Sequence, residues 1–563
     1  MLIFSSLFLV LSTAISSRRD TTILYSRIGM IILFYCIYLC YNNLFITYLD
    51  NGLGLFGGLL YTSSITLIFH ILIFFISFLI LSMTSFYPRK LISKKYNSLY
   101  KLLFTKLKFT KKRKTIVSNL ILKKGVQFTI REYTLMLLLI ITGAVLLISS
   151  NDLVTIYLAI ELQSYGLYLL CAMYRNSESS TSAGLTYFLL GGLASCFILL
   201  GIALIYANLG ITYLDSFYVI NNLAVIINKE EITIYIPYCL ILLSVGFLFK
   251  ISAAPFHFWS PDVYDRIPTI VTTFVAIITK ISILILLLQL VHYTNNIYLT
   301  NKYFWTSSLL ISSVLSLIIG TILGLTQSRI KRLYAYSTIS HLGFILLALT
   351  INSVESTQAF IFYLTQYSIS NLNAFIILVA IGYSLYEYKD KNEDHNNLID
   401  KNNSPIQLIS QLKGYFHINS ILAISLSITL FSFAGIPPLV GFFAKQMVFS
   451  AALQEGFIFL TLIGVLASVI SGVYYLFIIK TMYFDNHSYI YYNNIKDIKI
   501  PAFILYIKEK KKEYFGTKLP LSSSLTIIIS ILTMFILLFI FLPNEWLHMS
   551  NLLAITLFVP TNI

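Results

Sequence analysis

The sequence is poor in charged residues and in cysteine. Charged side chains make up 11% of its 563 residues, whereas an average soluble chain has about 25%. This scarcity excludes an ordinary soluble domain, because such a domain exposes charge over much of its surface. The five cysteines stand singly in apolar segments, without the spacing of a disulfide framework or of a zinc or iron–sulfur site. We interpret them as small core side chains.

The sequence also lacks a recognisable cofactor motif. The stretch "GLGLFG" at 52–57 matches G-x-G-x-x-G, but no predicted strand precedes it and no acidic residue follows about 20 positions later. We interpret it as a loop between two helices. His395, among acidic residues of a polar insertion, is interpreted as solvated surface. The chain is therefore predicted to hold no nicotinamide, flavin, haem or metal.

Long apolar runs are what the sequence does contain. Hydrophobic residues make up 57% of the chain, and about 20 apolar residues suffice to span a bilayer as a helix. We predict an all-α polytopic membrane protein of about 14 transmembrane helices, near residues 2–16, 28–49, 64–86, 133–150, 152–174, 183–208, 234–254, 268–291, 304–325, 330–350, 356–386, 417–453, 457–483 and 522–543. The first run is short, and the twelfth is too long for one plain span.

The net charge of +16 is distributed unevenly between successive loops. Of 39 Lys and Arg residues, 34 fall on one set of alternate loops and only Lys229 and Lys302 on the other. This asymmetry indicates that the basic loops, above all Arg89–Arg131, face the negative compartment, and that the N terminus lies on the opposite side. Such basic stretches beside a membrane usually contact lipid surfaces, so we prefer this interpretation to RNA binding.

The N-terminal segment "MLIFSSLFLVLSTAISSRRD" has its positive charges after the apolar run, which favours a first span over a signal peptide. No Arg-rich transit sequence precedes it, so a mitochondrial location would require synthesis inside the organelle. The abundance of Tyr (40) and Phe (42), together with Ile, Asn and Lys, indicates an AT-rich organellar genome.

Two predicted spans are interrupted by proline and glycine. One contains "KISAAPFHFWSPD" with Pro255 and Pro261, and the other "FAGIPPLVGFFAK" with Pro437 and Pro438. Proline breaks a helix, and broken backbone is tolerated at membrane depth only inside protein or beside water. The breaks fall in the fourth span of two successive groups of five, which predicts two inverted repeats with discontinuous helices 7 and 12.

These repeats set the predicted domain organisation. Residues 1–132 contain three N-terminal helices and a basic loop, 133–303 the first repeat, 304–484 the second repeat, and 485–563 a polar loop, a last helix and a tail.

Four ionisable residues lie deep in predicted spans: Glu161, Lys250, Lys280 and Lys445. Such residues are costly within a bilayer and usually mark an ion path. A buried carboxylate and a buried lysine each favour the neutral form, whereas pairing them favours both charged forms. A pair formed by Glu161 and Lys250 would therefore change its proton affinity with distance. The alternative is a static buried ion pair.

His341 lies in "YSTISHLGF", and histidine exchanges protons near neutral pH. We interpret it as a relay between Lys280 and Lys445, with helix packing as the alternative. Other polar residues of the spans are interpreted as structural: His70 as a core residue, His257 and Trp259 as packing at the first break, and Asp262, Asp265 and Arg266 as its basic-side rim.

The segments "AIELQSYGLYLL", "FKISAAPFHFWSPDVYDRIPTIVTTFVAIITK", "YSTISHLGF" and "AGIPPLVGFFAK" closely resemble the antiporter-like (Mrp-type) subunits of the proton-pumping NADH:ubiquinone oxidoreductase, respiratory complex I, over roughly 133–483. The resemblance implies a fold of 14 helices and a proton path through Glu161, Lys250, Lys280 and Lys445. Lysine at both of the last two positions favours the subunit 2 branch. Flavin, iron–sulfur clusters and quinone would then belong to other subunits, and this chain would contact a neighbouring antiporter-like subunit and structural lipids.

Three hypotheses follow from these features. The first is a proton-translocating membrane-arm subunit in the mitochondrial inner membrane, with its N terminus on the intermembrane-space side. The second is an independent Mrp-type cation/proton antiporter, which would exchange sodium for protons on its own. The third is a scaffold, in which neutralising the lysines would spare proton pumping.

Overall fold

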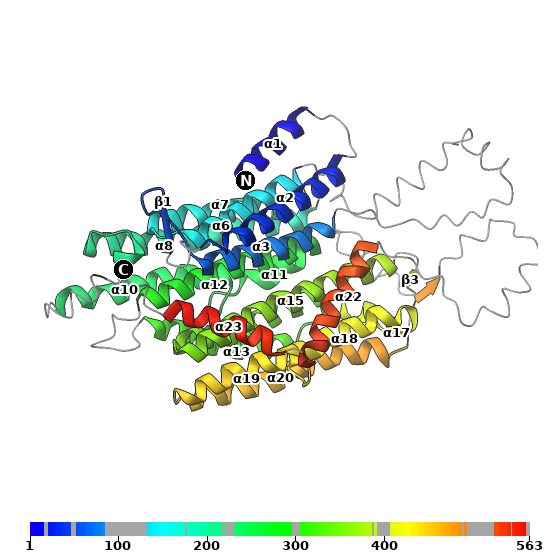
Figure 1. Cartoon of the computed structure of the whole chain (residues 1–563). Coiled ribbons are helices and arrows are strands. Elements are labelled where there is room, and N and C mark those ends of the chain that lie inside the picture. The colour runs from blue at the N-terminus through cyan, green and yellow to red at the C-terminus, as the bar shows by residue number, and fades with distance from the viewer. Residues whose placement is uncertain are drawn as a thin grey trace, which may run out of the picture.

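The computed structural model describes residues 1–15, 21–46, 52–84, 132–174, 177–216, 219, 230–294, 305–385, 388–390, 406–486, 489–491, 523–541 and 543–558. The basic insertion predicted at 88–131 lies outside these residues. The described residues form a helical bundle (Figure 1). Ten of its helices are long and apolar enough to cross a membrane, and four shorter apolar helices accompany them. The chain is therefore an all-helical, multi-span membrane protein in its main architecture.

The helices of the N-terminal half are α1 (Leu2–Ile15), α2 (Thr21–Asn43), α3 (Ser64–Ser82), α6 (Tyr133–Ser149), α7 (Leu153–Ala172), α8 (Glu178–Leu209), α10 (Glu230–Ile251), α11 (Trp259–Arg266) and α12 (Thr269–Tyr293). Those of the C-terminal half are α13 (Thr306–Leu325), α14 (Ile330–Ile351), α15 (Val354–Leu385), η4 (Ile409–Leu412), α17 (Tyr415–Ile418), α18 (Ser420–Ala434), α19 (Val440–Gln454), α20 (Ile458–Tyr483), α22 (Ser523–Leu538), η5 (Phe539–Phe541) and α23 (Pro543–Phe558). Each predicted apolar run overlaps at least one of these helices.

The long run at 417–453 is divided into α17, α18 and α19, as its predicted interruption requires. The structure adds α23, which lies in the segment predicted as a tail. Two short hairpins also accompany the helices: β1 (Leu53–Leu55) pairs antiparallel with β2 (Leu60–Thr62), and β3 (Tyr388–Asp390) pairs with β4 (Tyr489–Tyr491). β1 and β3 lie at opposite ends of the bundle (Figure 1).

The "GLGLFG" segment thus forms β1 and the following turn rather than a plain loop. The turn is possible because Gly57 and Gly58 adopt φ angles of 72° and 90°, which glycine reaches without steric cost. The hairpin also accepts a backbone hydrogen bond from Asn151 at the carbonyl of Leu59. It therefore covers the turn between α6 and α7.

The centre of the bundle consists of α12, α14 and α15. In the apolar stretches of these three helices, 94%, 94% and 89% of the residues are buried inside the bundle, whereas in those of α8 and α20 only 33% are buried. A helix that is apolar on all sides must be surrounded by protein or lipid, and α12 and α14 are surrounded by protein. Polar side chains on these two helices consequently face other side chains and not lipid.

Both predicted interruptions lie between helices. Pro255 lies between the end of α10 at Ile251 and the start of α11 at Trp259, and Pro437 and Pro438 lie between α18 and α19. Pro261 instead lies in the first turn of α11, where a helix tolerates proline because the N–H has no intrahelical partner. The indole of Trp259 donates a hydrogen bond to the carbonyl of Phe249 (3.0 Å). It thereby satisfies a carbonyl in the last turn of α10.

Candidate functional site: a line of buried lysines

Glu161 and Lys250 face each other from α7 and α10. Lys250 Nζ lies 3.8 Å from Glu161 Oε1, and the two side chains are 5% and 12% exposed. The same ammonium donates a hydrogen bond to Tyr168 Oη (3.3 Å), and Ser164 Oγ lies 3.5 Å from Glu161 Oε2. The ion pair is therefore longer than a hydrogen bond, and Lys250 has a second, neutral partner within reach.

This geometry makes the pair adjustable. Glu161 Oε1 is buried and has no hydrogen-bond partner among the described residues, so a small movement of Lys250 toward it would form a charge-assisted bond. Movement toward Tyr168 would weaken the pair instead. Tyr168 was not identified from the sequence, although it follows Glu161 by seven residues and so lies on the same helical face.

Lys280 lies in the middle of α12 and is 1% exposed. Its ammonium donates to Thr338 Oγ1 on α14 (3.1 Å) and lies 5.7 Å from the centroid of the Tyr264 ring. Lys280 forms no ion pair with any described residue. An ammonium buried without a counter-charge is costly, and this cost favours a proton-exchanging role over a structural one.

His341 lies on α14 between Lys280 and Lys445. Its Nδ1 is 2.8 Å from Tyr363 Oη and its Nε2 is 3.3 Å from Tyr475 Oη. On α14, Lys280 contacts Thr338 and Lys445 lies over the ring of Phe344, three residues to either side of His341. Two hydroxyl partners are compatible with helix packing as well as with relay, because each hydroxyl can donate or accept a proton.

Lys445 lies near the start of α19, beside the second break. Its ammonium donates to the carbonyls of Phe433 (3.0 Å) and Ala434 (2.9 Å), which end α18. It also lies 5.4 Å from the centroid of the Phe344 ring. The C-terminal end of a helix carries a partial negative charge, so the broken helix supplies the ligands of this ammonium.

Comparison with known proteins identifies the family of the chain. The family described as "NADH:quinone oxidoreductase/Mrp antiporter, TM" matches residues 150–471. The NADH-ubiquinone oxidoreductase chain 2 of Rhizopus oryzae is 42% identical, over 99% of this chain and 100% of that protein. The chain belongs to the NADH:quinone oxidoreductase/Mrp antiporter family.

Solved structures show the same antiporter-like fold. A chain of respiratory complex I from Thermus thermophilus with bound aureothin is 22% identical, with a TM-score of 0.66 and 97% of each chain covered. A chain of the Mrp complex from Dietzia sp. DQ12-45-1b is 16% identical, with a TM-score of 0.72, and the match covers 100% of this chain and 97% of that one. At these identities the likeness concerns the fold alone.

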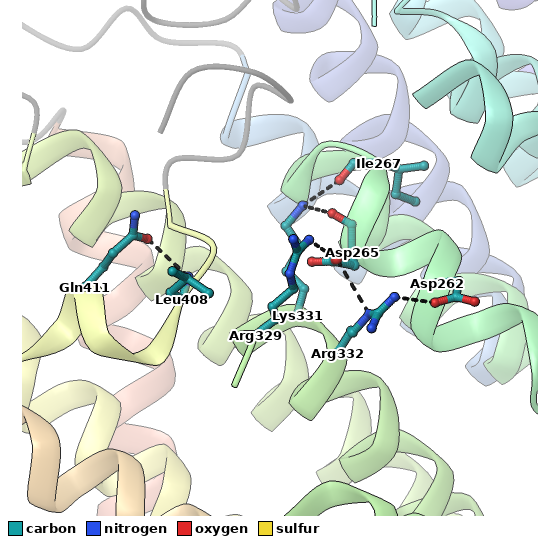
Figure 2. A network of polar contacts seen from close by, with 8 residues as sticks. All are labelled: Asp262, Asp265, Ile267, Arg329, Lys331, Arg332, Leu408 and Gln411. Atoms are coloured by element: carbon teal, nitrogen blue, oxygen red, sulfur yellow. Dashed lines mark hydrogen bonds and ion pairs between the residues drawn. The ribbon is translucent and has the colours of Figure 1, made fainter. Parts of the chain in front are cut away.

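The residues predicted as the rim of the first break form contacts between helices. Asp262 forms an ion pair with Arg332 (2.6 Å) and Asp265 with Arg329 (2.5 Å), so both carboxylates join α11 to α14 (Figure 2). Arg266 instead donates to Ser182 (3.4 Å). Asp265 is 3% exposed and is therefore a buried residue.

One buried lysine, Lys331, was not identified from the sequence. Lys331, in the first turn of α14, is 1% exposed, but it was not named among the deep charged residues because it lies at the edge of the predicted span 330–350. The available signal was its spacing, because Lys331 precedes Thr338 by seven residues and shares its helical face.

His70 and His257 make packing and main-chain contacts. His70 Nε2 lies 3.1 Å from the carbonyl of Val145, and the ring of His257 packs 4.7 Å from that of Phe258. In the part of the chain that the structure describes, no group of three His, Cys, Asp or Glu side chains is placed to hold a metal ion.

Proposed function

We propose that this chain is a proton-translocating, membrane-arm subunit of respiratory complex I, the NADH:ubiquinone oxidoreductase. Its membership of the family and its full-length similarity to chain 2 of Rhizopus oryzae support this function. NADH oxidation and quinone reduction would take place in other subunits, which would hold the flavin, the iron–sulfur clusters and the quinone. This chain would move protons in response.

The observation that most supports proton movement is the line of buried protonatable groups. Lys250 meets Glu161 on one side of the bundle centre. Lys280 and His341 follow on α12 and α14 of that centre, and Lys445 on α19 lies against Phe344 of α14. An isolated buried charge is unfavourable, and a nearby like charge makes it more so. A proton that binds to one group therefore makes protonation of its neighbours less favourable. Charge is thus passed along the line instead of accumulating.

The pair formed by Glu161 and Lys250 would act as the input to this line. When Lys250 approaches Glu161, the charged forms of both are stabilised; when it turns to Tyr168, its ammonium loses a counter-charge and releases a proton more readily. Lys280 and His341 would receive the proton. Lys445, held by two main-chain carbonyls, would be the terminal group that loads or releases it.

The finer architecture is part of the same proposal. The chain would cross the mitochondrial inner membrane 14 times, with inverted five-helix repeats at 133–303 and 304–484, and with the N terminus in the intermembrane space. The basic loops support this orientation. The largely uncovered faces of α8 and α20 would contact phospholipid and a neighbouring antiporter-like subunit.

The substitution Glu161→Gln tests the proposal, since Gln keeps the shape of Glu but carries no negative charge. We expect the complex to assemble but to pump protons and reduce quinone more slowly, because Lys250 loses its counter-charge. Both rates are measured in reconstituted vesicles at equal complex content. Wild-type rates would exclude the switch and favour the scaffold hypothesis.

The fold shared with the Dietzia Mrp complex keeps an independent antiporter as the second candidate. Proton transport by the isolated chain in vesicles distinguishes an independent antiporter from a complex I subunit. An antiporter would exchange protons against an imposed sodium gradient, whereas a complex I subunit would show no such exchange and its removal would abolish the coupled redox activity.

A further inference from the structure

Three basic residues gather where α11 ends and α14 begins (Figure 2). Arg329 and Arg332 are partly exposed and bind the carboxylates of Asp265 and Asp262. Lys331 lies deeper, and its ammonium donates to the main-chain carbonyls of Ile267 (2.6 Å) and Asp265 (3.3 Å). The cluster therefore runs from the basic-side surface to a fully buried ammonium.

A purely structural role would account for part of this arrangement. A cation at the N-terminal end of a helix opposes the dipole of that helix, but a cation at the C-terminal end of another helix is favourable. Lys331 belongs to the first turn of α14 and reaches the last carbonyls of α11, so it acts as a C-terminal cap. Capping alone, however, does not explain why the two helices that hold Lys331 also contact Lys280.

Two elements connect Lys331 with Lys280. On α14, Thr338 follows Lys331 by two turns on the same face, a rise of about 10 Å at 1.5 Å per residue, and Thr338 accepts a hydrogen bond from Lys280. On α11, Asp265 accepts from Lys331 while the preceding residue, Tyr264, places its ring beneath the ammonium of Lys280. The two helices that hold Lys331, α11 and α14, therefore also supply contacts of Lys280.

Two tyrosines belong to the same helices: Tyr264 precedes Asp265 on α11, and Tyr334 follows Lys331 by three residues on α14. The phenol oxygens of Tyr264 and Tyr334 are buried and have no hydrogen-bond partner among the described residues, and the same is true of Asp265 Oδ1. Buried polar groups are almost always hydrogen-bonded, and in a polar interior the remaining partner is water. Two tyrosine hydroxyls and bridging water would form a connection able to conduct a proton.

We propose that Lys331 is a further proton-transfer residue, which takes up protons from the basic side beside Asp265 and passes them through Tyr264 and Tyr334 toward Lys280. The proposal depends on the proposed function. Each transfer moves one proton from the Lys331 ammonium along the hydroxyls to the neutral Lys280 amine. The Lys331 amine then regains one proton from water at the rim, so that no oxidant or reductant is needed.

Lys331→Arg separates proton transfer from capping. Arginine keeps the positive charge and N–H donors for the two carbonyls but cannot readily give up a proton. In the assembled complex, in vesicles, we expect coupled quinone reduction and proton uptake to fall about tenfold or more. Arg266→Gln is the matched control, because it removes a charge from the same rim outside the connection, and its rates should remain those of the wild type. Wild-type rates in Lys331→Arg would show that Lys331 only caps α11 and does not transfer protons.

The double substitution Tyr264→Phe and Tyr334→Phe gives an independent test, should the larger arginine prevent assembly. It removes two hydroxyls, leaves both rings in place and does not touch the cap. We expect slower pumping and a larger solvent deuterium isotope effect on turnover, which a loss of packing would not produce. An unchanged rate and isotope effect would overturn the proposal. Slow pumping in Glu161→Gln beside normal pumping here would show that only this inference fails and that the proposed function stands.

Discussion

At Gly441 the backbone of α19 touches the end of α18. A methyl group added to its Cα would lie 1.8 Å from the carbonyl oxygen of Ser432 and 2.8 Å from the carbonyl carbon. Real contacts of a Cβ atom do not fall below about 3.0 Å. Since the opposing atoms are backbone, they have no rotamer through which to move away. Gly441→Ala must therefore push the two helix ends apart by more than 1 Å.

This displacement would act directly on Lys445. Lys445 follows Gly441 by four residues and thus lies on the same face of α19. Its ammonium is held at 3.0 and 2.9 Å by the carbonyls of Phe433 and Ala434, so a shift of about 1 Å would carry both contacts beyond hydrogen-bond distance. Overpacking of this kind costs about 1–3 kcal/mol, and a 1 Å misplacement at a reacting group lowers a rate by up to about 100-fold.

The assay compares assembled complex, coupled quinone reduction and proton uptake in vesicles for Gly441→Ala and Gly192→Ala. A methyl group at Gly192 would meet nothing within 4 Å, so this control tests glycine replacement in a helix without a clash. We expect Gly441→Ala to lower pumping much more than complex content, and Gly192→Ala to change neither. Equal pumping by the two variants would refute the view that the approach of α19 to α18 positions Lys445.

Two further predictions concern the end of the proton line and the topology. Lys445→Met keeps the bulk of the side chain and removes the titrating group, and Lys445→Arg cannot readily release its proton, so both should assemble with impaired pumping; wild-type proton-to-electron ratios in both would make Lys445 structural. The basic insertion at 88–131, which lies outside the described residues, should be protected from protease in intact mitoplasts because its charge places it in the matrix, and cleavage there would reverse the topology.

The deep charged residues could be found from the sequence because each is rare and costly in an apolar run. The hydroxyl groups that contact these residues could not be predicted from the sequence. The chain contains 40 tyrosines, and periodicity does not indicate which of them meets a given lysine across a helix interface. Tyr168, which contacts Lys250, shares the helical face of Glu161, but so do neighbouring side chains with no such contact. The choice depends on how α7 and α10 both pack against α8.

Rules that use only the neighbouring sequence also fail to predict some features at the ends of the helices. Lys331 was not recognised as buried because hydropathy measures composition along one segment, whereas the burial of this side chain depends on its contacts with the end of α11. Pro261 was interpreted as part of a break, but proline is equally suited to the first turn of a new helix. The strands β1 to β4 have three residues each, too few for a period-two pattern to be recognised.

The helix breaks and the buried lysines act as one structural device. Among the described residues four lysines are buried, and three of them lie at helix C-terminal ends: Lys250 in the last turn of α10, Lys331 at the end of α11 and Lys445 at the end of α18. A helix end with its partial negative charge attracts an ammonium and releases a neutral amine. Protonation at each end therefore changes how firmly the break is held, and movement of the break changes proton affinity in return. Lys280, in the middle of the intact helix α12, lacks this coupling, and its position between the breaks suits a group that only passes the proton on.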